Sequence, residues 1–214
     1  MKTMRTFFSA TLLIAYHAVS MPATGLESLE NFVKTVKSGK SDFTQTVTSP
    51  TRAGEAPRVK TSSGTFEFQR PGKFKFQYKK PFEQLILADG TSLWIFDADL
   101  NQASQRKQSA AFANTPAALI ASATDLSALR SEFTLENAPG KDGLVWINAK
   151  PKSQESTLQI VRIGFKSDTL QQLDITDSFG QRSLINFSIM QLNPSLPPSS
   201  FQFNLPKGAE LLKQ

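Results

Sequence analysis

The feature that most constrains the fold of this chain is a series of short segments in which apolar and polar residues alternate. In residues 73–78, KFKFQY, an aromatic side chain occupies every second position, with lysine or glutamine between. A period of two is that of a β-strand with one buried face. We predict strands at residues 43–47, 64–69, 73–78, 84–88, 91–96, 101–107, 133–137, 144–149, 157–165, 170–176 and 182–189.

Turn signals separate these segments at short intervals. Asp89-Gly90 is typical of a tight hairpin, and Gly143 and Gly180 fall between other predicted strands. Short strands so spaced predict a strongly curved antiparallel sheet or barrel, so the predicted fold class is mainly β with α. The Pro-rich stretch 194–214 is expected to run across the sheet edge.

Two stretches have helical spacing instead. Apolar residues of 26–38 recur three and four positions apart. In residues 114–130, Thr115 can cap a helix that begins at Pro116, and Asp125 can start a second short helix. Folded over the concave face of a curved sheet, these helices would enclose apolar space. The pattern does not decide whether that space is a packed core or an apolar pocket.

The N-terminal residues have the layout of a cleaved secretory signal. Lys2 and Arg5 precede an apolar stretch, 7–16, that is too short to span a bilayer. Small residues follow at 18–20, AVS, where a signal peptidase cleaves. We therefore expect residues 1–20 to be a signal peptide that directs export from the cytoplasm.

Removal of the signal limits the chemistry open to the rest of the chain. His17 is the only histidine and lies within it, and the chain contains no cysteine. Residues 21–214 therefore offer no His- or Cys-ligated zinc site, no Ser-His-Asp triad and no thiol nucleophile. We predict no catalytic residue, no metal and no cofactor. Without an internal repeat or long linker, residues 21–214 are expected to form one domain.

The segment 68–76, FQRPGKFKF, is similar to the RPG-x-F-x-W segment of the periplasmic outer-membrane lipoprotein carriers (LolA). Residues 115–120, TPAALI, resemble the lid helix of that family, and 201–208, FQFNLPKG, resemble its ending. The match continues in the correct order at residues 43–45, 81, 84–86, 89–90 and 93–97. Because these segments cover most of the chain after residue 20, the resemblance is more specific than any one motif.

The resemblance implies an unclosed, strongly curved antiparallel β-barrel, covered by a few helices that enclose an apolar cavity. It implies a periplasmic chaperone that binds the acyl chains of lipoproteins released by an inner-membrane ABC transporter. The carrier then delivers them to an outer-membrane lipoprotein receptor. Three acyl chains contain about 40 methylenes, whose exposure to water would cost on the order of 30 kcal/mol, so transit requires a carrier. We expect a monomer with no nucleic-acid partner.

The resemblance also assigns roles to single residues. Arg70 matches the arginine that hydrogen-bonds carbonyl groups of the lid helix and holds the empty cavity closed, which suits the five donors of a guanidinium. Ala117 is smaller than the apolar residues frequent at that position, so the lid is expected to seal less tightly. For each phenylalanine taken singly, an ordinary core position remains an equal alternative. Acyl-chain binding and the lid are expected at Phe66, Phe68, Phe74, Phe76, Ala117, Leu119 and Ile120.

Two other classes of function are alternatives to a carrier: a periplasmic sensor or binding module for lipids or lipoproteins on the same fold, and a lipid hydrolase. Asp97 with Asp99, or Asp174 with Asp177, would offer a carboxylate pair, but all lie near turns, where Asp commonly accepts local hydrogen bonds. The chain has no Gly-x-Ser-x-Gly motif. The lysines of 73–80 fit a solvated strand face better than a nucleic-acid site.

We predict cleavage after Ser20, so that the exported protein begins at Met21. The intact mass of protein that is expressed with its leader and recovered from the periplasm of a bacterial host checks this directly. A start at Thr24 would place cleavage after Ala23, and a mass that retains residues 1–20 would contradict the signal peptide.

Overall fold

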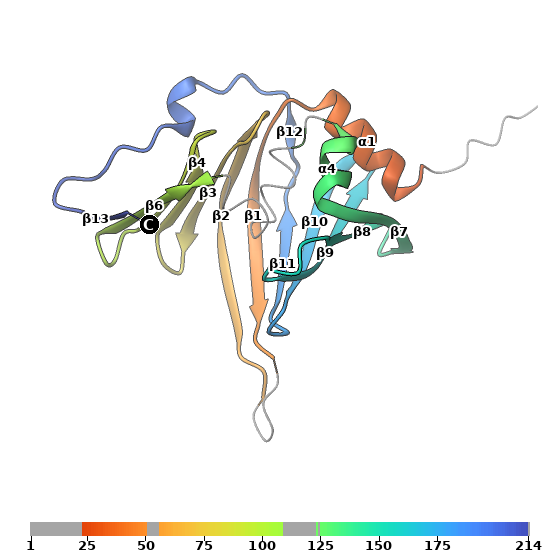
Figure 1. The fold of residues 1–214 in the computed structure, drawn as a ribbon, viewed down its shortest axis with the longest axis horizontal. Helices are drawn as coiled ribbons and strands as arrows, with labels where there is room; N and C mark the ends of the chain where they lie inside the picture. Colours follow the sequence, from red (N-terminus) through yellow and green to blue (C-terminus); the bar gives the residue numbers. More distant parts are fainter. Residues whose placement is uncertain (1–22, 51–55, 109–122, 124, 214) are drawn as a thin grey trace, which may run out of the picture.

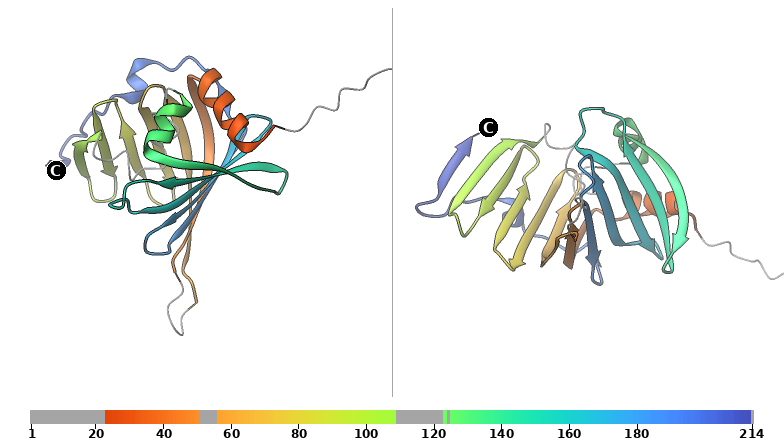
Figure 2. Two further views of the ribbon diagram at one scale, coloured as in Figure 1. Left: turned by 45° about the vertical axis from the view of Figure 1, so that its right-hand side comes forward. Right: turned by 90° about the horizontal axis from the view of Figure 1, so that it is seen from below.

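The computed structural model describes residues 23–50, 56–108, 123 and 125–213, so the predicted signal peptide and residues 115–120 of the predicted lid helix lie outside the described part. Its framework is one 13-stranded sheet in the order β13-β6-β5-β4-β3-β2-β1-β11-β10-β9-β8-β7, with β12 paired to β1 (Figure 1). Among the described residues the end strands β13 and β7 do not pair with each other. Seen from below, the strands follow an arc (Figure 2), so the sheet is strongly curved and unclosed, as predicted.

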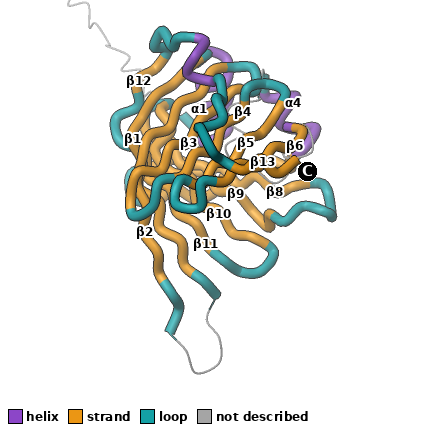
Figure 3. Tube along the Cα trace, turned by 90° about the vertical axis from the view of Figure 1, so that its left-hand side faces the viewer, coloured by secondary structure: helices purple, strands orange, loops and turns teal. Residues whose placement is uncertain are grey.

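All the predicted strands are present, and several are longer than expected. Each pairing is antiparallel except that of β13, which lies parallel to β6. Strands β1 and β2 extend beyond the neighbouring strands at one end of the sheet (Figure 3). The strands are β1 (Ser38–Thr48), β2 (Val59–Gln69), β3 (Lys73–Lys80), β4 (Gln84–Ala88), β5 (Ser92–Asp97), β6 (Gln102–Lys107), β7 (Phe133–Lys141), β8 (Leu144–Pro151), β9 (Leu158–Lys166), β10 (Thr169–Asp177), β11 (Arg182–Phe187), β12 (Gln191–Leu192) and β13 (Glu210–Lys213).

The first predicted helix is α1 (Gly25–Thr35), which ends earlier than the expected residue 38 because β1 begins there. A capping box starts it: the Thr24 hydroxyl accepts from the Glu27 backbone N–H, and the Glu27 carboxylate accepts from the Thr24 backbone N–H. Leu29, Phe32 and Val33 are buried against β7 to β10. The concave face of the sheet is the one that α1 covers.

The second short helix, α4 (Leu126–Glu132), starts where the sequence predicts it. Asp125 is its N-cap, and the carboxylate accepts a 2.8 Å hydrogen bond from the Ala128 backbone N–H. This helix packs against β7 and α1, so both described helices lie over the β7 to β10 half of the sheet (Figure 1). Within the described ranges, no helix is long and apolar enough to cross a membrane.

The Pro-rich C-terminal stretch passes over the convex face and does more than cross the edge. A short 3₁₀ turn, η2 (Pro198–Phe201), buries Phe201, and the ring of Phe203 stacks on Trp94 of β5 at 4.7 Å between centroids. The chain then adds β13 to the edge of β6. These contacts cover apolar residues on the convex face that alternation alone would leave exposed.

Close packing of α1 on the sheet depends on a glycine. Gly25 begins the helix, and a Cβ at this position would overlap the backbone carbonyl oxygen of Trp146 on β8 and lie 3.0 Å from a side-chain carbon of Ile147. Only a residue without a side chain lets the helix start approach the strand this closely.

We predict that Gly25→Ala lowers the free energy of unfolding by about 1–3 kcal/mol, because the helix start must move away from β8. Chemical denaturation followed by tryptophan fluorescence measures this. Glu30→Ala, at an exposed position of the same helix, is the matched control and should change stability by less than about 0.5 kcal/mol. Equal stability of Gly25→Ala and the parent protein would contradict the close packing.

Candidate functional site

Phenylalanine side chains form a continuous cluster on the concave face. Phe66 of β2 lies at its centre, with ring centroids 4.4 Å from Phe76, 5.7 Å from Phe68 and 5.3 Å from Phe187. Phe32 of α1 closes one end of the cluster, 6.0 Å from Phe68. Aromatic packing therefore joins the helix to the central strands.

The four phenylalanines predicted to contact acyl chains all belong to this cluster. The register pairs Phe66 with Phe76 and Phe68 with Phe74 across β2 and β3, and their side chains are only 0–5% exposed. In this closed arrangement they are core residues, so a ligand would reach them only after the packing opens. The other predicted lid positions lie outside the described residues: Ala117, Leu119 and Ile120.

The predicted latch residue, Arg70, lies in the turn between β2 and β3, beside the cluster. Its Nε donates a 2.8 Å hydrogen bond to the carbonyl oxygen of Ala123, and its Nη1 donates to the carbonyl oxygen of Val36. Val36 is the C-cap of α1, and Ala123 follows the predicted lid helix by three positions. One guanidinium therefore ties this turn to two separate segments of chain, and the second of them, at Val36, was not predicted.

The surroundings of Arg70 are unfavourable for a charge. Its Cζ lies 5.3 Å from the ring centroid of Phe32 and 5.0 Å from that of Phe68. Burial lowers the pKa of Arg70 to about 10. Its Nη2 has no hydrogen-bond partner among the described residues. The two carbonyl bonds and the aromatic contacts offset part of the desolvation cost of this buried guanidinium.

A pocket of about 450 Å³ lies on the same concave face, at the ends of β1 to β5 away from Arg70. Its rim includes Phe82 and Leu100, whose side chains are 57% and 70% exposed. None of the four predicted phenylalanines lines the pocket. This pocket of mixed polarity was not predicted from the sequence.

Tyr78 marks the boundary between the cluster and the pocket. Its ring lies 5.1 Å from that of Phe43. Its hydroxyl donates a 2.8 Å hydrogen bond to Gln45 Oε1, and Gln45 Nε2 donates one of 2.6 Å to Ser183 Oγ. Burial raises the pKa of Tyr78 to about 12. The chain of polar groups is already ordered across β3, β1 and β11.

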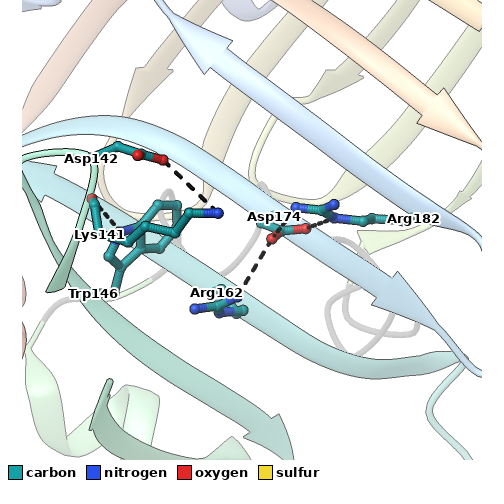
Figure 4. Close-up of polar contacts among 6 residues, drawn as sticks. All are labelled: Lys141, Asp142, Trp146, Arg162, Asp174 and Arg182. Atoms are coloured by element: carbon teal, nitrogen blue, oxygen red, sulfur yellow. Dashed lines mark hydrogen bonds and ion pairs between the residues drawn. The ribbon is translucent and has the colours of Figure 1, made fainter. Parts of the chain in front are cut away.

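The carboxylates weighed as catalytic pairs have structural partners instead. Asp174 is held by Arg182 at 2.7 and 2.9 Å, and Arg162 Nη1 lies 3.9 Å away (Figure 4). The hydrogen bond from Arg182 to Asp174 raises the pKa of that guanidinium. Asp177 accepts from two backbone N–H groups of the next turn, at 2.9 and 2.8 Å. In the part of the chain with described placement, no group of three or more acidic or His residues could hold a metal ion.

An unclosed, strongly curved sheet with an aromatic concave face and helices packed across it defines a half-barrel protein with a hydrophobic interior. The family described as outer membrane lipoprotein carrier protein LolA matches residues 34–204. This chain belongs to that family.

Relatives match over nearly the whole chain. The outer-membrane lipoprotein carrier protein of Albidiferax ferrireducens is 57% identical, covering 97% of this chain and 99% of the relative. The protein of the same name from Cupriavidus pinatubonensis is 42% identical, covering 98% and 99%. Among solved structures, a LolA superfamily protein from Nitrosomonas europaea has a TM-score of 0.46 at 13% identity, covering 85% of this chain and 99% of the other.

We predict that Tyr78 ionises at about pH 12 in the folded protein and near its ordinary pKa of 10.0 after unfolding. Tyr78 is the only tyrosine of residues 21–214, so the phenolate absorbance of protein that begins at Met21 reports this group alone. Because the folded-state pKa is raised, the stability it contributes is complete below pH 10 and is lost as the pH rises through about 12.

The matched variant is Tyr78→Phe, which should lose that part of the decline in the free energy of unfolding above pH 10. A folded-state midpoint close to 10 would show that the phenol is not buried in solution.

Proposed function

We propose that this protein is a periplasmic chaperone that binds the acyl chains of lipoproteins released from the inner membrane and carries them to an outer-membrane receptor. The observation that carries the proposal is the aromatic concave face, closed at one end by the hydrogen bonds of Arg70 to two backbone carbonyls. Its role is binding and not catalysis. Membership of the lipoprotein carrier family favours this role over a sensor on the same fold.

The volume of the pocket requires the carrier to open for its cargo. A methylene occupies a volume similar to that of a water molecule, roughly 30 Å³. A pocket of about 450 Å³ therefore holds roughly 15 methylenes, far fewer than the roughly 40 of three acyl chains. In this proposal, further room comes from separation of the aromatic cluster and the elements that cover it.

In this proposal, Arg70 controls that separation. Breaking its bonds to Val36 and Ala123 would free the turn between β2 and β3 from α1 and from the chain near the lid. The bonds form again only in the empty, closed carrier, so closure competes with the cargo for the concave face. This competition favours release to a receptor.

The carrier supplies no energy of its own. The chain has no Gly-x-x-x-x-Gly-Lys motif, so ATP hydrolysis belongs to the inner-membrane ABC transporter that loads it. Transfer to the outer-membrane receptor then runs toward higher affinity. A monomer, freed of residues 1–20 on export, is sufficient for this cycle.

We predict that Arg70→Leu still accepts lipoproteins from spheroplasts but transfers them to receptor-bearing outer-membrane vesicles at least tenfold less well, because the empty closed state is weakened. Soluble carrier–lipoprotein complexes measure loading, and vesicle-bound lipoprotein measures transfer. Arg130→Leu, at an exposed position of α4, is the control and should behave like the parent protein. Normal transfer by Arg70→Leu would rule out the latch role, and failure of the parent protein to load would rule out the carrier.

A further inference from the structure

The concave face changes from mainly apolar to more polar toward one end of six neighbouring strands, although the change falls at different levels on different strands. Toward Arg70 its side chains are those of the aromatic cluster and of aliphatic neighbours such as Ile86 and Ile95. Toward the other end every strand places a polar group on the same face. These groups are Ser183, Gln45, Ser62, Tyr78, Gln84 and Asp97.

The register places these polar groups in adjacent rows of the concave face. Tyr78 lies opposite Gln84, which lies opposite Asp97, and Gln45 lies opposite Ser62. Tyr78 faces Gly64, so Ser62 and Gln45 lie one row further from Arg70, and Ser183 faces Val47 in the row after that. The six groups thus form a slanted band across the curved sheet, which we call the polar band, and five of its six members line the 450 Å³ pocket. Ser183 joins the band through its hydrogen bond to Gln45.

Hydrogen-bonding capacity in the band is only partly used. Tyr78, Gln45 and Ser183 bond to one another, and Asp97 Oδ1 accepts from the Leu100 backbone N–H at 3.1 Å. The side chains of Ser62 and Gln84 make no hydrogen bond to another described residue. Free donors and acceptors inside a pocket with an exposed apolar rim are suited to a ligand that is itself part polar and part apolar.

We propose that the polar band is the subsite for the polar end of an acylated ligand: the ester and amide linkages and the first peptide groups. The inference rests on the proposed carrier function and adds a direction to it. The acyl chains run from the band toward Phe68 and Arg70, and the polypeptide leaves past Phe82 and Leu100. The reverse orientation would bury ester and amide groups unpaired among phenylalanine rings, which costs tenfold or more in affinity for each group.

The dimensions of the face agree with this direction. Ser62 and Phe68 are six residues apart on β2, which corresponds to about 20 Å along a strand. An acyl chain that spans one leaflet of a hydrocarbon core of ~30 Å needs about 15 Å. The aromatic stretch beyond the polar band is thus long enough for an extended acyl chain.

Photocrosslinking tests the orientation. A synthetic diacylglyceryl-cysteine lipopeptide would carry a diazirine either at an acyl terminus or on its third amino acid, and mass spectrometry would locate the adducts. We expect the peptide probe to label 80–84 and 97–100, and the acyl probe to label 66–76 or α1. The opposite distribution would overturn the proposal. If excess unlabelled lipopeptide competes with neither probe, the carrier function itself fails, and the subsite with it.

A binding measurement tests the band independently. Gln84→Met should weaken lipopeptide binding about tenfold but leave unchanged the binding of diphenylhexatriene, an apolar dye without hydrogen-bonding groups. Gln77→Met, on the convex face of β3, is the matched control and should affect neither probe. Unchanged lipopeptide affinity, or an equal loss for both probes, would overturn the subsite while leaving the carrier function standing.

Discussion

The pairing register of β1, β2 and β3 is the constraint on which the rest of the molecule depends. A slip of one residue would turn every phenylalanine of β2 to the convex side. Both faces oppose such a slip: Phe66 meets Phe76 on the concave face, while on the convex face Glu67 lies 2.9 Å from Lys40 and 2.8 Å from Lys75. Burial alone would raise the pKa of Glu67, but the hydrogen bonds from the two lysines outweigh it and lower that pKa. The aromatic cluster, the surface on which α1 packs and the polar band all depend on this alignment.

The latch role proposed for Arg70 would let the same interior be closed when empty and open to cargo. An apolar side chain at this turn would pack permanently against Phe32 and Phe68, whereas a guanidinium makes closure depend on two carbonyl groups that belong to separate segments. In the proposed cycle, acyl chains replace the covering elements, and the aromatic rings exchange one apolar neighbour for another. The net gain in buried apolar area is then small, which favours moderate affinity and release.

Most of the framework could be predicted from the sequence. In an antiparallel sheet with one solvent-exposed face, apolar and polar residues alternate along each strand. The N-cap at Asp125 could also be predicted, because it depends only on neighbouring residues. Features that depend on contacts between distant parts of the chain were not predictable. The residues of β13 do not alternate, and this strand lies against β6 only through tertiary structure. The bond from Arg70 to Val36 uses a backbone carbonyl, which every residue has, so the residue type at position 36 does not indicate it. The polar band was not predicted for the same reason, because Gln84 and Asp97 are ordinary strand-end residues in the sequence and only the pairing of β4 with β5 brings them opposite each other.

The pairing of β1 with β11 is a seam between two halves that are otherwise built from neighbouring hairpins. Strands β1 to β6 form one run and β7 to β11 the other, while the seam joins residues distant in sequence, such as Gln45 and Ser183, 138 positions apart. Closing so long a loop carries an entropic cost before any contact repays it, so we expect assembly of the seam to limit the folding rate. Until the seam forms, each half has a strand edge with unpaired backbone groups and an exposed apolar face. A protein that shields lipids from water therefore passes, during its own maturation, through a stage in which its own interior is unshielded.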